Sequence, residues 1–210
     1  MTVSNIDKIK TAMAGTSRKI KEKEIWKGLE KMYSPQIADF TWRMIHGRVK
    51  CGPFFRHIPN WQEKEFCSCG ASESIEHILV LCEESGQQEL WNLVGEKWRQ
   101  ETGLVMGDMN IGTIMGAGTL EVDDLQGEVK KPATDLLRKL IALTSWVIWK
   151  ERNHRIFNER EMLPQRLLTR WTKEVRREIK IYLWEKANTK RMRAGRMMWT
   201  INGTFAEMRR

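Results

Sequence analysis

Three of the four cysteines and one of the four histidines of this 210-residue chain lie within residues 67–82, in the stretch CSCGASESIEHILVLC. The candidate ligands are Cys67, Cys69, His77 and Cys82, spaced C-x-C, then seven residues to His, then four residues to Cys. Three thiolates and one imidazole form a closed tetrahedral set that is usual for structural zinc. The spacing therefore predicts one structural Zn²⁺ bound by these four side chains.

The compartment bears on this prediction, because cysteines that lie close together can also form disulfides. The first residues are polar and charged, without the apolar segment of a signal peptide, and no run of about 18 apolar residues occurs. We therefore expect an intracellular protein, in the nucleus or the cytoplasm, without a membrane partner. Clustered thiols in such reducing compartments are more often metal ligands than disulfides.

Two alternatives to this ligand set remain open. The stretch could hold three buried cysteines near a surface histidine, although the compact spacing favours a metal. Cys51, His46 and His57 also lie close enough along the chain to replace a ligand. For Cys51 a free buried thiol is the simpler expectation.

A turn and a short helix would position the four ligands. Gly70 relieves the backbone just after the C-x-C pair. SESIEHILVLC then predicts a helix with Ser72 or Ser74 as N-cap, from which His77 projects and at whose end Cys82 lies. We expect four apolar side chains of this helix to face the core: Ile75, Ile78, Leu79 and Leu81.

The rest of the chain also indicates helices, and no stretch alternates convincingly as a strand. Apolar residues recur at helical spacing over residues 37–45, 90–98 and 133–155, and a last helix begins at Pro164. In that last helix a heptad-like seam suits packing against the preceding helix. The seam comprises Leu168, Trp171, Val175, Ile179 and Tyr182.

These patterns predict a mainly α fold: a small helical domain held together by a structural zinc ion, then an antiparallel helical pair and a basic tail. The expected divisions are a charged helical lead-in over 1–33, the zinc domain over 34–101, a Gly-rich linker over 102–132, a helical hairpin over 133–187 and a loosely ordered basic tail over 188–210. The linker is predicted because 102–132 is rich in Gly and acidic residues and has no sustained period.

Positive charge gathers in the last quarter of the chain. Residues 150–210 contain 17 Lys and Arg against 7 Asp and Glu, whereas the remainder is nearly neutral. This asymmetry indicates either an anionic partner, with RNA or DNA first, or a solvated helix face with a basic tail. The cations that would contact phosphate are Arg166, Arg170, Arg176, Arg177, Lys190, Arg191, Arg193 and Arg196. Trp199 would either stack on a base or anchor the tail.

Several segments together resemble the reverse transcriptase zinc-binding domain of non-LTR (LINE-type) retrotransposons. They are FTWRMIHGRV, IPNW, the cysteine stretch with its Glu73-Ser74 pair, LWNLVGEKW with Trp91, and SWVIWKERNHRIFN. The resemblance covers roughly residues 34–160. It implies a module from the C-terminal region of a retroelement reading frame, with one structural zinc and with a reverse transcriptase polypeptide as a candidate partner.

The catalytic motifs of such elements do not occur in this sequence. We find no Y/F-A-D-D motif, and Asp108, Asp123, Asp124 and Asp135 do not follow the strand pattern that a two-metal ribonuclease site needs. We therefore expect a non-catalytic protein without a small-molecule substrate. The expected function is zinc binding with weak binding of nucleic acid. The alternatives are a protein-interaction module, which an exposed apolar patch on the 37–45 helix would favour, or an orphan fragment without a selected function.

Overall fold

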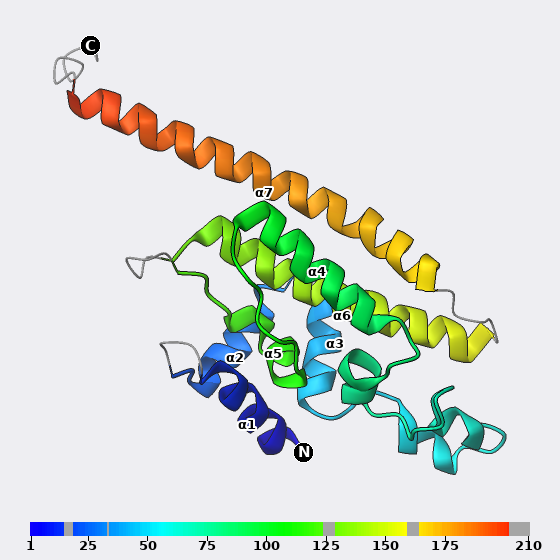
Figure 1. Ribbon diagram of the computed structural model, residues 1–210. Coiled ribbons are helices and arrows are strands. Elements are labelled where there is room, and N and C mark those ends of the chain that lie inside the picture. Colours follow the sequence, from blue (N-terminus) through cyan, green and yellow to red (C-terminus); the bar gives the residue numbers. More distant parts are fainter. Residues whose placement is uncertain (15–18, 33, 124–128, 159–163, 202–210) are drawn as a thin grey trace.

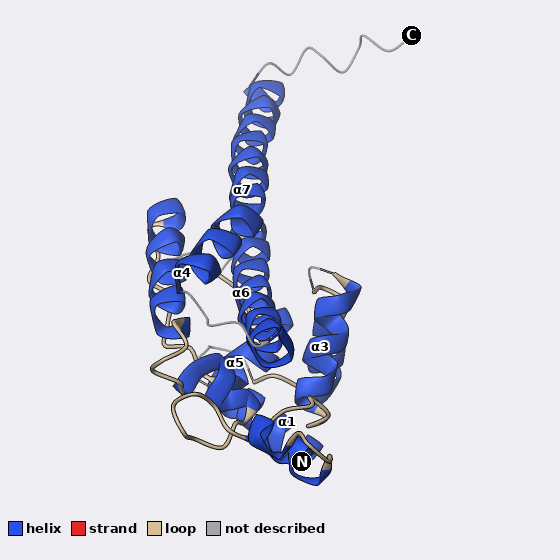
Figure 2. Ribbon diagram, turned by 90° about the vertical axis from the view of Figure 1, so that its right-hand side faces the viewer, coloured by secondary structure: helices blue, strands red, loops and turns tan. Residues whose placement is uncertain are grey.

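The computed structural model describes residues 1–14, 19–32, 34–123, 129–158 and 164–201. In these ranges the chain is helical, and its only extended pairings are two isolated bridges, Phe66 with Ser72 and Asp123 with Val129. The predicted mainly α class is confirmed (Figures 1 and 2). Within the described ranges, none of the helices combines the length and the apolar character that crossing a bilayer requires.

Seven α-helices make up most of the described chain. They are α1 (Thr2–Met13), α2 (Glu22–Leu29), α3 (Pro35–Ile45), α4 (Gln87–Thr102), α5 (Ile111–Met115), α6 (Lys131–Asn158) and α7 (Pro164–Ile201). Between α3 and α4 the chain forms two short 3₁₀ helices, Gly52–His57 and Gln62–Glu65, and one π-helical turn, His77–Leu81. The segment between α3 and α4 therefore contains all four predicted metal ligands.

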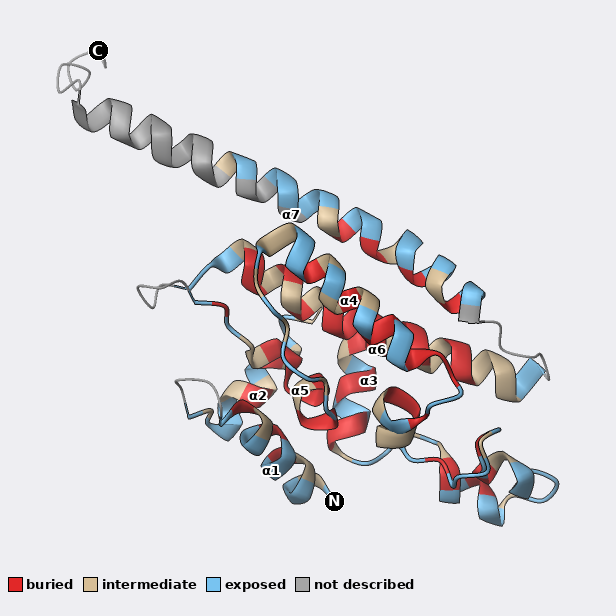
Figure 3. Ribbon diagram, viewed as in Figure 1, coloured by how far each residue is buried: buried red, intermediate tan, exposed pale blue. Residues whose placement is uncertain are grey.

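Helix α6 is the centre of the core, and α3, α4, α5 and α7 pack against it (Figure 3). Leu140, Ile141 and Val147 on α6 are completely buried, as are Ile45 on α3 and Leu90 on α4. These side chains belong to one continuous cluster that runs from α1 to α7. The wide apolar face predicted over residues 133–155 follows from this position, because α6 is covered on several sides. The bounds predicted for the zinc domain (34–101) and the helical hairpin (133–187) stay predictions.

Helices α6 and α7 pack antiparallel, as the seam predicts. Trp171 is buried and donates its indole N–H to Thr144 Oγ1 at 2.8 Å, and Lys139 pairs with Glu178 at 3.2 Å. Val175 is buried as expected, but Leu167 is buried more completely than Leu168, which lies partly exposed at the edge of the seam. The side chain of Tyr182 lies outside the described part.

The predicted loose tail over 188–210 is corrected in part. Helix α7 continues without a break to Ile201, beyond the helices against which it packs (Figure 1), while residues 202–210 lie outside the described chain. The local sequence explains the difference, because Lys, Arg, Met and Ala dominate KANTKRMRAGRMM and all favour helix. Basic composition indicated disorder, whereas helix propensity argues for an extended helix.

The predicted linker over 102–132 is also different in the structure. It contains α5, whose Ile111, Ile114 and Met115 are buried and which packs on α1. The glycines permit close backbone contacts rather than flexibility: a Cβ on Gly118 would lie 2.1 Å from the carbonyl oxygen of Gly28. Glycine content predicted a loop because sequence alone does not distinguish these two uses of the residue.

Candidate metal centre

The structure brings the four predicted ligands into one cluster. The sulfur atoms of Cys67, Cys69 and Cys82 and a ring nitrogen of His77 all lie within 4.8 Å of one another. Cys67 Sγ is 3.6 Å from Cys82 Sγ, and Cys69 Sγ is 3.4 Å from His77 Nε2. Tetrahedral zinc with Zn–S bonds of about 2.3 Å and a Zn–N bond of about 2.0 Å places its ligand atoms roughly 3.5–3.8 Å apart. The cluster is therefore compatible with one metal ion.

A tight turn holds the first two ligands. The backbone N–H of Gly70 donates to the carbonyl of Cys67 at 2.9 Å, and the N–H of Cys67 donates to Ala71 at 2.8 Å. Gly70 adopts a φ of 83°, in the left-handed region where glycine is favoured. This turn directs Cys67 and Cys69 to the same side, as the position of Gly70 in the sequence predicts.

A π-helical turn holds the other two ligands. The N–H of Cys82 donates to the carbonyl of His77 at 3.0 Å, so the two ligand residues form the i to i+5 bond of that turn. In an α-helix residues five apart are rotated by about 140°, whereas the wider turn brings them towards one face. Ser74 begins the helix, since its Oγ accepts from the N–H of His77 at 3.0 Å.

The π turn also changes which apolar side chains are buried. Ile78 and Leu79 are buried and Ile75 is partly buried, as predicted, but Leu81 is 61% exposed. The prediction for Leu81 was wrong because it assumed 3.6 residues per turn, and the wider turn rotates Leu81 away from the core.

The thiols of the cluster affect one another. Burial alone would raise the pKa of Cys67, but hydrogen bonds from the Cys69 N–H and from the side chains of His77, Cys82 and Ser68 lower it to about 6. The pKa of Cys69 is raised: the Ala71 N–H lowers it, but burial and the neighbouring thiols together outweigh that bond. One thiol is thus stabilised as the thiolate that metal binding requires.

Two arginines of α6, Arg152 and Arg155, contact Glu73, which lies on the segment between the two pairs of candidate ligands. The Glu73 carboxylate accepts from Arg152 Nε at 2.8 Å, and Arg155 Nη2 lies 3.8 Å from it. Arg155 also lies 3.4 Å from Ser68 Oγ, between the two ligands of the turn. A metal dication with three thiolates would have a net charge of −1, and with Glu73 that makes −2. The two guanidinium groups balance this charge.

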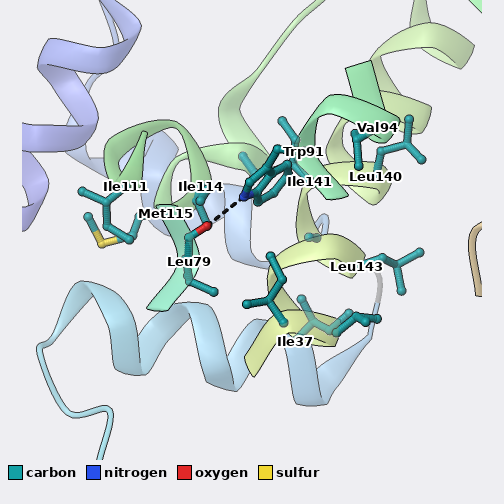
Figure 4. Packing of buried hydrophobic residues seen from close by; sticks show 14 of the residues in the cluster. Ile37, Leu79, Trp91, Val94, Ile111, Ile114, Met115, Leu140, Ile141 and Leu143 are labelled. Carbon is teal, nitrogen blue, oxygen red and sulfur yellow. Dashed lines mark hydrogen bonds between the residues drawn. The ribbon is translucent and has the colours of Figure 1, made fainter. Parts of the chain in front are cut away.

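Two side chains of α4 donate hydrogen bonds to the π-helical turn. Trp91 donates its indole N–H to the carbonyl of Leu79 at 2.7 Å (Figure 4), and Gln87 donates its side-chain amide to the carbonyl of Cys82. Both carbonyls lie where the helix ends, so they lack partners within it. The side chains that position the metal ligands therefore come from two helices, α4 and α6.

The segments that carry the resemblance come together in the same part of the fold. Phe40 of α3 stacks on Trp149 of α6, with ring centroids 5.4 Å apart. Glu73 and Arg152 form their ion pair behind the cluster, and Trp91 binds the π turn. These residues lie in the segments that carry the resemblance, but contacts between segments so far apart leave no local pattern in the sequence.

The alternative ligands lie elsewhere. Cys51 is outside the cluster, and its pKa is raised to about 11, chiefly by burial, with Arg152 opposing and Glu73 adding to the effect. His46 lies between Trp26 and Trp42, at centroid distances of 5.5 and 4.2 Å. His57 is exposed. Among the described residues, the four ligands predicted first are the ones that meet.

The predicted phosphate contacts divide into two groups. Arg166, Arg170, Arg176 and Arg177 lie on exposed positions of α7. Arg170 also binds Glu151 at 3.3 Å. Lys190, Arg191, Arg193, Arg196 and Trp199 lie on the part of α7 whose side chains are outside the described structure.

Comparisons of the chain with protein-family models, with curated proteins and with solved structures found no match.

Proposed function

We propose that the chain is a non-catalytic zinc-binding module of the reverse transcriptase type, which also binds RNA or DNA weakly. The observation that supports it is the closure of the spaced Cys67, Cys69, His77 and Cys82 into one cluster. The supporting contacts of Glu73 with Arg152 and of Trp91 with Leu79 join the segments of the resemblance around that cluster. In this proposal Glu73, Trp91 and Arg152 share one structural role, which is to position the four metal ligands.

Zinc is the metal that suits this donor set. Thiolate and imidazole ligands with tetrahedral spacing favour zinc over the oxygen-preferring magnesium and calcium. Four protein ligands leave no open position at which water or substrate would bind, so the proposed role is structural. The binding energy then stabilises the fold between the turn and the π-helical segment.

The nucleic-acid role is supported by the exposed face of α7. Its cations step by four, three, four and three residues, a spacing that places them on one stripe of a helix. The stripe comprises Arg166, Arg170, Lys173, Arg177 and Lys180, all exposed. Such a stripe contacts phosphates without reading the base sequence. Because binding releases counterions from the nucleic acid, the affinity falls as the salt concentration rises.

Titration of fluorescent RNA and DNA with the zinc-bound chain at several salt concentrations tests this role. The variant Arg166→Gln, Lys173→Gln, Lys180→Gln is expected to lower the slope of log K against log salt by about 2, at roughly 0.7 per phosphate contact for single strands. The matched control Lys10→Gln, Lys23→Gln, Lys27→Gln removes the same charge from α1 and α2. Equal binding by the two variants contradicts a role for the stripe.

A protein-interaction role has one observation in its favour. Ile181, Leu183 and Trp184 of α7 are exposed, and Trp184 is 68% accessible. On helix α3, where an exposed apolar patch would also favour this role, Ile37 and Phe40 are buried and Trp42 is 39% exposed. Affinity for a reverse transcriptase polypeptide that Trp184→Ala abolishes, without any salt-dependent binding of nucleic acid, would favour this second function.

A further inference from the structure

An open pocket of about 660 Å³ lies between the end of α3, the 3₁₀ helix Gly52–His57 and the segment that leads into His77. Arg48, Lys50, Phe54 and Ile75 are among the residues that line it. Its volume is within the range of sites that bind ligands of nucleotide size. The sequence of residues 51–66, with its Gly-Pro and Ile-Pro pairs, indicates only an extended or turn-rich connector and predicts no ligand site there.

The pocket is positively charged. Arg48 and Lys50 are exposed, and neither has a carboxylate partner among the described residues. Arg43 also lines the pocket, but it is paired with Asp39 at 2.8 Å. Of the described lining residues only Glu73 is acidic, and its buried carboxylate is bound by Arg152. Arg48 and Lys50, which carry positive charge without a described carboxylate partner, therefore suit an anionic ligand.

An aromatic ring forms one wall of the pocket. Phe54 is 45% exposed, and Lys50 Nζ lies 5.3 Å from the centre of its ring. Behind it the buried Phe55 packs edge-on at 5.3 Å, and Phe55 in turn contacts Trp61 and Phe157. These packed rings hold the Phe54 ring in place, while part of that ring stays accessible to a ligand.

Cations without a carboxylate partner, beside an accessible aromatic ring, are the combination that binds single-stranded nucleic acid. We propose that the pocket binds a single strand of RNA or DNA, with phosphates at Arg48 and Lys50 and a base on Phe54. A duplex fits less well, because its bases stack on one another and offer no free face. The inference rests on the proposed nucleic-acid role and adds a second contact surface, formed by other residues than the stripe on α7.

The experiment titrates a labelled 20-nucleotide single strand and its duplex with the full zinc-bound chain at several salt concentrations. For the double variant Arg48→Gln, Lys50→Gln we expect the single-strand salt slope to fall by about 1.4, at roughly 0.7 per phosphate. The control Lys130→Gln, Lys131→Gln removes the same charge immediately before α6 and at its first residue, the opposite end of the helix from Phe157, and should leave the slope unchanged.

Phe54→Leu and Phe54→Tyr test the stacking contact. Leucine keeps an apolar side chain and the fold but has no ring, so single-strand affinity should fall about tenfold, or about 1.4 kcal/mol, at every salt concentration. Tyrosine should restore the affinity. Duplex affinity should be the same for both variants. Zinc content equal to that of the unaltered chain shows that each variant is folded.

The outcomes separate the pocket from the proposed function. If the unaltered chain binds single strands but the pocket variants bind as the control does, the pocket inference is overturned and the role of α7 stands. If the unaltered chain binds no nucleic acid at low salt, the proposed nucleic-acid function itself fails. If polyglutamate competes as well as an unlabelled strand of equal charge, or Phe54→Leu has no effect, the pocket recognises charge alone and the proposal is overturned.

Discussion

The carboxylate of Glu73 accepts a hydrogen bond from Arg152 Nε at 2.8 Å, although the two residues are 79 positions apart. Both side chains are almost fully buried. Glu73 lies on the segment between the two pairs of metal ligands, and Arg152 lies on the central helix α6. The pair therefore joins the segment that carries the candidate metal ligands to the core of the protein.

Breaking this pair should destabilise the chain strongly. Glu73→Gln leaves a buried guanidinium without its counter-charge, which costs about 3–5 kcal/mol. The double variant Glu73→Gln, Arg152→Met should cost less than the sum of the single changes, because it also removes the unpaired charge. Urea denaturation of the zinc-bound variants measures each loss.

The exposed pair of Asp39 with Arg43 is the matched control. Solvent screens it, so Asp39→Asn should change stability by less than about 1 kcal/mol. A loss for Glu73→Gln as small as that of Asp39→Asn would show that the buried pair does not tie the cluster to α6.

A second prediction concerns the indole of Trp91. Trp91→Phe keeps a large ring but leaves the carbonyl of Leu79 without its donor, and should cost about 1–3 kcal/mol. Trp184→Phe changes an exposed side chain and should stay within about 0.5 kcal/mol. Equal stabilities of the two variants in urea would contradict a role for the Trp91 hydrogen bond at the π turn.

Local sequence was sufficient for part of the site. Donor types and their spacing predicted the four residues that meet, and Gly70 with Ser74 predicted the turn and the helix start. The contacts that support the ligands were not predictable, because Glu73 meets Arg152, and Trp91 meets Leu79, only through tertiary packing. The exposure of Leu81 was missed for a different reason, since a single π turn leaves no periodic signal in five residues.

Substitutions at two glycines can distinguish a flexible linker over residues 102–132 from a packed segment. Gly118→Ala would place a methyl group against the Gly28 backbone and should destabilise by about 1–3 kcal/mol. Gly107→Ala meets open space and should be neutral or stabilising by up to about 1 kcal/mol. Thermal unfolding compares them, and a neutral Gly118→Ala would support the linker interpretation after all.

The raised pKa of Cys51 predicts that the stability of the folded chain falls at alkaline pH. Its pKa is raised from 9.0 to about 11, so the folded chain keeps a proton that the unfolded chain loses between these values. The stability contribution is complete below pH 9 and is lost as pH rises towards 11, by an amount on the order of 2 kcal/mol. Denaturation of the unaltered chain and of Cys51→Ala at pH 8, 9.5 and 11 measures it. An unchanged difference between the two chains would contradict a buried, neutral thiol.

The central claim is one zinc held by Cys67, Cys69, His77 and Cys82, and the most direct test is the metal content of the chain purified without chelator. Elemental analysis should give about one zinc per chain. Cys67→Ser and His77→Ala should lose the zinc and the stability that it provides, while the control Cys51→Ser should keep both. A folded chain without zinc, or loss of the metal in Cys51→Ser alone, would contradict the account.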